Sequence, residues 1–163
     1  MNIKRARKVI KLKKTVANTR GLSFIQARLL NKKFWSFSYG SVARALMIGM
    51  FWMMIPMPFQ MIPAVVMSVY FRANIPIALI CVWLSNPVTW LPIYFTNYLF
   101  GCYMLNIKIN VIDWQSYAAY MIDHIHDFWK PLYLGSIVGG MILGGICFTL
   151  VYVVKFLRNI FKV

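Results

Sequence analysis

The sequence predicts an all-α membrane protein with two proline-broken helical hairpins, an amphipathic interfacial helix and a glycine-rich C-terminal transmembrane helix. Of its 163 residues, 61% are hydrophobic and only 13% are charged, a balance typical of integral membrane proteins. Most of its apolar runs are shorter than the ~20 residues that a straight spanning helix needs. Prolines also interrupt these runs, and prolines stop helices. We therefore expect re-entrant hairpins that dip into the bilayer.

Residues 1–40 form a basic arm with an amphipathic helix, and residues 41–163 form a single membrane domain. The first 33 residues hold 11 of the 18 Lys and Arg residues and no acid. The positive-inside rule places this arm in the cytoplasm. Three cations near the other end indicate the same side: Lys155, Arg158 and Lys162. We therefore expect a multi-pass protein of the cell inner (cytoplasmic) membrane with both termini cytoplasmic.

Two kinds of partner would attract the basic arm. Anionic lipid headgroups bind juxtamembrane Lys and Arg, and nucleic acid binds such residues through its phosphates. No nucleic-acid-binding fold follows the arm, which adjoins a membrane segment. Membrane lipids with anionic headgroups are therefore the expected partner, and nucleic acid is not.

The first predicted hairpin runs along residues 42–55, breaks at Pro56 and Pro58, and returns along 61–71. The second runs along 75–84, breaks at Asn86 and Pro87, and continues along 90–105. The two breaks share the pattern Pro-x-(Gln/Thr)-x-x-Pro at a spacing of 29 residues. The matching positions are Pro58, Gln60 and Pro63 in the first break and Pro87, Thr89 and Pro92 in the second. Broken helices at corresponding positions of two repeats indicate a transport site. The alternative is that residues 42–71 form one long kinked helix, or two tilted crossings, with the prolines tolerated through neighbouring contacts.

Two further helices complete the predicted domain. Residues 110–130 place aromatic and aliphatic side chains at helical spacing, which favours an interfacial helix. His124 and His126 are two residues apart and face different sides of a helix, so we expect no metal site. Residues 132–156 have full spanning length and carry glycines spaced for close helix packing. These are Gly135, Gly139, Gly140 and Gly144, and they indicate either an internal contact or a dimer seam.

Five polar residues form the predicted site for an anionic headgroup. Gln60, Asn86 and Thr89 lie at the breaks, where amides and hydroxyls would face a polar cavity. Arg72 supplies a cation between two apolar runs, and Asn74 would hold it. Each residue also has a structural interpretation. Arg72 and Asn74 would form a turn at the membrane surface, and the three break residues would cap free backbone groups.

The sequence contains no arrangement of residues typical of an enzyme. It has no glutamate, and its three aspartates lie in the single segment 113–127. We find no nucleophile motif, no phosphate-binding glycine loop and no metal-ligand spacing. We therefore expect a protein that is not an enzyme and that carries no cofactor or metal.

The motifs around the breaks resemble a bacterial membrane family known as domain of unknown function 2062. They are Pro56-x-Pro58-x-Gln60-Met61, Arg72-x-Asn74-x-Pro76-x-Ala78 and Trp83-x-Ser85-Asn86-Pro87-x-Thr89-x-x-Pro92-x-Tyr94. The resemblance covers about residues 40–157 and implies an inner-membrane protein without implying an activity. This chain has Phe59 where the family often has glycine. A looser likeness exists to the DedA superfamily of lipid carriers, which also has proline-flanked re-entrant loops.

Two functions fit these expectations. The first is binding or translocation of an anionic lipid or polyprenyl phosphate between the two broken hairpins. The second is a non-catalytic assembly or interaction subunit of a cell-envelope membrane complex. In the second case the partner would be another membrane protein or a second copy of the chain.

Overall fold

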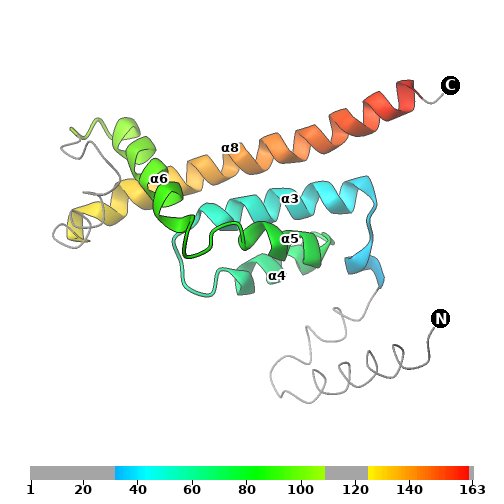
Figure 1. Ribbon diagram of the computed structural model, residues 1–163, viewed down its shortest axis with the longest axis horizontal. Helices are drawn as coiled ribbons and strands as arrows, with labels where there is room; N and C mark the ends of the chain where they lie inside the picture. The colour runs from blue at the N-terminus through cyan, green and yellow to red at the C-terminus, as the bar shows by residue number, and fades with distance from the viewer. Residues whose placement is uncertain (1–31, 109–124, 162–163) are drawn as a thin grey trace, which may run out of the picture.

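The computed structural model describes residues 32–108 and 125–161, and every regular element in these ranges is helical. The all-α prediction is thus confirmed for the described part of the chain. The elements are η1 (Lys32–Trp35), α3 (Tyr39–Met54), α4 (Met61–Tyr70), α5 (Ile75–Val82), α6 (Trp90–Met104) and α8 (Ile125–Ile160) (Figure 1). The predicted amphipathic helix of the basic arm lies outside the described residues.

The first predicted helix pair is present as α3 and α4. Helix α3 begins after Ser38, whose hydroxyl accepts a hydrogen bond from the Ser41 N–H. It ends at Ile55 because Pro56 follows and cannot continue the helix. After the break, α4 runs back beside α3 (Figure 1). Its proline, Pro63, lies in the first turn, where a missing N–H costs little.

The turn between α4 and α5 is built around Arg72, which has a φ of 54°. The Ala73 N–H donates to the Ser68 carbonyl at 2.8 Å, so Arg72 occupies the left-handed position of a Schellman motif. Asn74 follows and caps α5. Its side-chain oxygen accepts from the Ile77 N–H at 3.1 Å. Helix α5 then packs on both α3 and α4, so that the three helices form one bundle (Figure 1).

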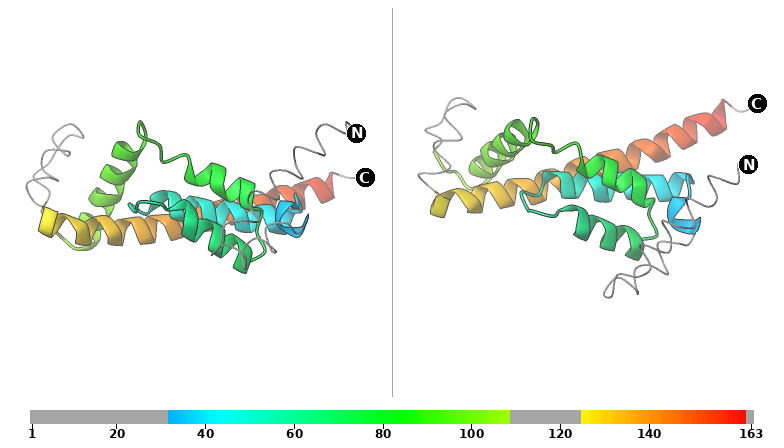
Figure 2. Two further views of the ribbon diagram at one scale, coloured as in Figure 1. Left: turned by 90° about the horizontal axis from the view of Figure 1, so that it is seen from below. Right: turned by 60° about the horizontal axis from the view of Figure 1, so that its bottom comes forward.

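The second predicted hairpin is not found, because α6 does not return along α5. It leaves the bundle after the break and packs across the N-terminal part of α8 (Figure 2). A glycine allows this approach: a Cβ on Gly101 would stand 1.7 Å from the Pro131 carbonyl oxygen. Four side chains form a core between the two helices, Tyr98, Cys102, Phe128 and Leu132. Contact between α6 and α8 therefore replaces the expected pairing of residues 75–84 with 90–105.

The C-terminal helix is longer than predicted and begins at Ile125 rather than near residue 132. It continues through the buried Pro131. Residues 125–130 are thus the first turns of α8 and not the end of a separate interfacial helix. Residues 110–124 of that predicted helix lie outside the described residues. Within the described ranges, the segment Phe128–Ile160 is the one helix long and apolar enough to cross a membrane.

The predicted glycine faces of α8 lie against other helices of the same chain. A Cβ on Gly135 would stand 1.9 Å from the Asn97 carbonyl oxygen of α6, and one on Gly139 would be 3.6 Å from the Asn97 side-chain oxygen. Gly140 and Gly144 face α3 instead, at 3.1 and 2.8 Å from its carbonyl oxygens. The structure therefore assigns these four glycines to internal packing.

Candidate functional site

The two proline breaks lie next to each other in space, although they are far apart in the sequence. Together they line a cavity of about 480 Å³. Its walls are Pro56, Met57, Pro58, Ser85, Asn86, Pro87, Trp90, Tyr94 and Leu132. A smaller cavity of about 240 Å³ lies beside it, between Gln60 and the segment 82–87. We call this region, residues 55–60 and 83–89, the break end.

Gln60 closes the end of α3. The last carbonyl groups of a helix receive no hydrogen bonds from within the helix. Pro56 and Pro58, which follow α3, have no backbone N–H and cannot supply a donor. In the orientation that satisfies all its neighbours, the Gln60 side-chain nitrogen donates to the carbonyl oxygens of Trp52 (2.8 Å) and Ile55 (3.0 Å). Its oxygen accepts from the Ser85 hydroxyl at 2.6 Å. Gln60 thus joins the two breaks, because its nitrogen caps backbone carbonyl groups of the first break and its oxygen binds a side chain of the second.

Helices α6 and α8 satisfy further carbonyl groups of the first break. The side-chain nitrogen of the buried Asn97 donates to the Met54 carbonyl at 2.9 Å and to the Ser136 hydroxyl at 3.1 Å. The Tyr133 hydroxyl donates to the Pro56 carbonyl at 2.8 Å. In hydrocarbon, an unsatisfied carbonyl costs several kcal/mol. These side chains therefore satisfy carbonyl groups that the proline break leaves without helical donors.

The second break is closed by its own side chains. The Asn86 side-chain oxygen accepts from the backbone N–H groups of Val88 (2.9 Å) and Thr89 (3.2 Å). The Thr89 hydroxyl accepts from the Asn86 N–H at 3.0 Å and donates to the Leu84 carbonyl. Local bonds of this kind stabilise turns and helix starts. Asn86 and Thr89 therefore hold the turn that precedes α6.

Arg72 and Asn74 lie away from the break end, because the whole of α4 separates them from Gln60. Ten residues of helix cover about 15 Å. Asn74 is fully buried, and its side-chain nitrogen donates to the Ser36 carbonyl at 3.0 Å. The five predicted ligand residues thus form two groups at opposite ends of the α3–α5 bundle, and not one site.

Among the residues that the structure describes, three arginines lie at the opposite end of the bundle, which we call the arginine end: Arg44, Arg72 and Arg158. Arg44 Nη2 donates to the Arg72 carbonyl at 3.1 Å, which fixes the turn. The Arg72 side chain is exposed and has no hydrogen-bond partner among the described residues. No acidic residue occurs in the segments 32–108 and 128–163.

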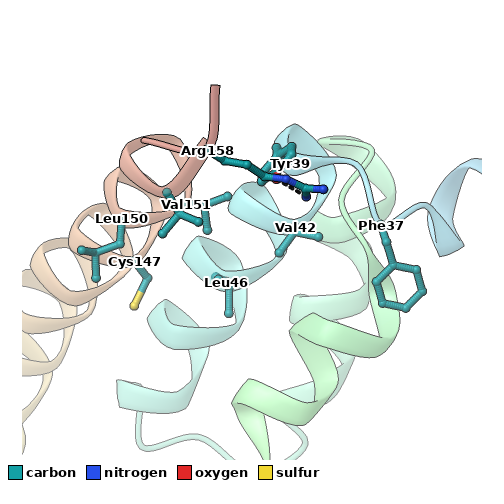
Figure 3. Close-up of a pocket in the computed structure, with 9 residues that line it drawn as sticks. Phe37, Tyr39, Val42, Leu46, Cys147, Leu150, Val151 and Arg158 are labelled. Atoms are coloured by element: carbon teal, nitrogen blue, oxygen red, sulfur yellow. Dashed lines mark hydrogen bonds between the residues drawn. The ribbon is translucent and has the colours of Figure 1, made fainter. Parts of the chain in front are cut away.

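An apolar groove of about 470 Å³ lies between α3 and α8 at the arginine end (Figure 3). Arg158 lies at the groove, where its Nη1 donates to the Tyr39 hydroxyl at 2.9 Å. In the sequence, Arg158 serves only as a topology signal, and Asn97, Tyr133 and Ser136 have no predicted role. Asn97 could have been found from the sequence, because an amide inside an apolar run indicates a buried hydrogen-bonding role. No sequence pattern distinguishes Tyr133, which binds the break, from a tyrosine at the membrane interface.

Comparison with known proteins gives one match. The model of a family described as "Uncharacterized protein conserved in bacteria (DUF2062)" matches residues 22–160. No curated protein and no solved structure matches the chain. The match agrees with the resemblance carried by the break motifs. The looser likeness to the DedA superfamily finds no support in these comparisons.

Proposed function

The chain belongs to the bacterial family DUF2062, and on that premise we propose that it is a multi-pass protein of the cytoplasmic membrane that binds anionic lipid. The ligand class is a phospholipid or polyprenyl phosphate, as expected from the sequence. The geometry favours the arginine end as the place of binding, rather than the space between the breaks.

The contacts along α8 support a position for each end of the bundle. Tyr133 contacts Pro56, and Arg158 contacts Tyr39. These two positions on α8 are separated by about 37 Å at 1.5 Å per residue, which slightly exceeds the ~30 Å of hydrocarbon. Helix α3 has 16 residues and covers about 24 Å, so it accompanies α8 through most of this thickness, which argues against an elbow at mid-membrane. The positive-inside rule then places the arginine end at the cytoplasmic face.

The single observation that carries the proposal is the state of Arg72. Its backbone is held by Arg44, while its own guanidinium group is exposed. Arg72 occupies a turn position with a φ of 54°, where glycine is the commoner residue. A guanidinium group presents paired N–H donors that match a phosphate. At the break end, by contrast, the side chains of Gln60, Asn86 and Thr89 are used by the protein itself.

Anionic-lipid binding by the full-length chain tests the proposal. In detergent, native mass spectrometry should show tighter binding of phosphatidylglycerol than of phosphatidylcholine. Arg72→Gln should weaken phosphatidylglycerol binding about fivefold, the equivalent of ~1 kcal/mol per basic residue at a membrane surface, and Arg72→Lys should retain most of it. Lys130→Gln removes a cation near the break end and serves as the matched control. Equal binding of the two lipids, or equal losses in Arg72→Gln and Lys130→Gln, would contradict the proposal. A stoichiometric co-purifying protein without lipid would favour an assembly subunit instead.

A further inference from the structure

We infer that the groove between α3 and α8 holds one chain of an anionic lipid whose phosphate lies on Arg158. This inference rests on the proposed function and deepens it, because it names the contact that selects a lipid at the arginine end. It adds a binding site made of Arg158, Tyr39 and the groove walls, none of which the predicted headgroup site included.

The shape of the groove fits a hydrocarbon chain. Its walls are Phe37, Tyr39, Val42 and Leu46 on one side, and Cys147, Leu150, Val151, Val154 and Arg158 on the other. Figure 3 shows Leu46 and Cys147 away from the polar end, where Arg158 and Tyr39 meet. Positions 147 and 158 on α8 are about 16 Å apart, roughly half of the ~30 Å of hydrocarbon in a bilayer. The groove thus has the depth of one leaflet.

The groove is accessible from the surrounding membrane. Leu150 and Val154 are 54% and 57% exposed, so a chain can enter sideways between the helices. A partner helix is a poorer occupant, because close helix contacts in membranes use small residues. Of the two glycines nearest the groove on α8, Gly144 already packs on α3, and Gly145 is not among the groove walls.

The charge at the end of the groove determines the kind of lipid. The Tyr39 hydroxyl engages one Nη of Arg158, and a guanidinium group has five N–H donors. The remaining donors can bind a phosphate oxygen pair while the hydroxyl keeps the group in place. With no acid in the neighbouring segments, the site favours an anionic headgroup over a zwitterionic one.

Two variants of the full-length chain test the inference. Arg158→Gln removes the charge and should weaken phosphatidylglycerol binding about fivefold, and Val151→Trp should weaken it by filling the groove. Val153→Trp places the same bulk at the same depth on a side chain that is 45% exposed and outside the groove walls, so binding should be unchanged. Arg158→Gln and Val151→Trp could bind phosphatidylglycerol like the wild type while Arg72→Gln still binds it weakly. In that case the inference of lipid in the groove is wrong and the proposed function stands. If the wild type shows no preference for phosphatidylglycerol, both fail.

A measurement on the wild-type protein tests the same inference without depending on whether a variant folds. Cys81 and Cys102 are buried, whereas Cys147 is partly exposed and lines the groove. Phosphatidylglycerol added to the detergent-solubilised protein should slow the reaction of the Cys147 thiol with N-ethylmaleimide severalfold, and the same amount of phosphatidylcholine should slow it less. Equal rates in the two lipids would overturn the inference.

Discussion

Gly135→Ala is expected to destabilise the protein by about 3 kcal/mol, the upper end of the usual range for overpacking. The added Cβ would stand 1.9 Å from the Asn97 carbonyl oxygen and 2.8 Å from the Gly101 backbone nitrogen. Both neighbours are backbone atoms of α6, so no side chain can rotate to make room. The whole of α6 would have to move away from α8, and the break end would lose Asn97 with it.

Gly145→Ala is the matched control for this prediction. Gly145 lies on the same helix, and nothing is within 4 Å of a Cβ added there. Alanine has the higher helix propensity, so this variant should be as stable as the wild type or slightly more so. Thermal denaturation in detergent, followed by circular dichroism, compares the two proteins. A similar loss in both would show that α6 does not pack on α8 at Gly135.

Asn97→Leu is expected to destabilise the protein by about 1–3 kcal/mol, the cost of leaving a buried polar group unsatisfied. The substitution removes the donor to the Met54 carbonyl and to the Ser136 hydroxyl. Asn97 and Ser136 are buried, so water does not readily replace the lost hydrogen bonds. Leucine has the same branched arrangement of side-chain heavy atoms as asparagine but bulkier methyl groups, so overpacking against α8 adds to the loss of hydrogen bonds.

Thr96→Val tests whether the effect belongs to Asn97 itself. Thr96 is the exposed neighbour on α6, and its hydroxyl donates to the Pro92 carbonyl at 2.9 Å within the same helix. Its replacement should change the midpoint of thermal unfolding little. Asn97→Leu should also increase proteolysis at residues 55–60, because the break loses one of its caps. Equal midpoints for the two variants would show that Asn97 does not hold the break.

Local chemistry explains which parts of the fold were predictable from the sequence. Prolines end helices through their own backbone, so the ends of α3 and α5 and the start of α6 fall close to the predicted positions. The position of α6 depends instead on glycines that are far apart in the sequence. Gly101 and Gly135 permit α6 and α8 to cross closely. No pattern within residues 90–105 indicates that α8 is the helix on which they pack.

For the candidate site too, features set by local chemistry are predictable from the sequence, and features set by distant contacts are not. The sequence placed Gln60, Asn86 and Thr89 at the breaks, and the structure brings the two breaks together. It left open whether these side chains would face a ligand or the backbone, because that depends on which carbonyl groups lie nearby in space. The prediction that Arg72 shares a site with the break residues is wrong, because ten residues of α4 separate it from Gln60. The helical rise alone gives that separation of about 15 Å.

Phosphatidylglycerol binding by Arg72→Gln and Asn86→Ala, measured side by side with the wild type, tests most directly whether lipid binds at the arginine end. Only variants that elute as the wild type does in size-exclusion chromatography are compared. Binding at the arginine end predicts a severalfold loss for Arg72→Gln and wild-type binding for Asn86→Ala, whose side chain holds the turn before α6. A loss confined to Asn86→Ala would contradict it and would return the headgroup to the space between the breaks.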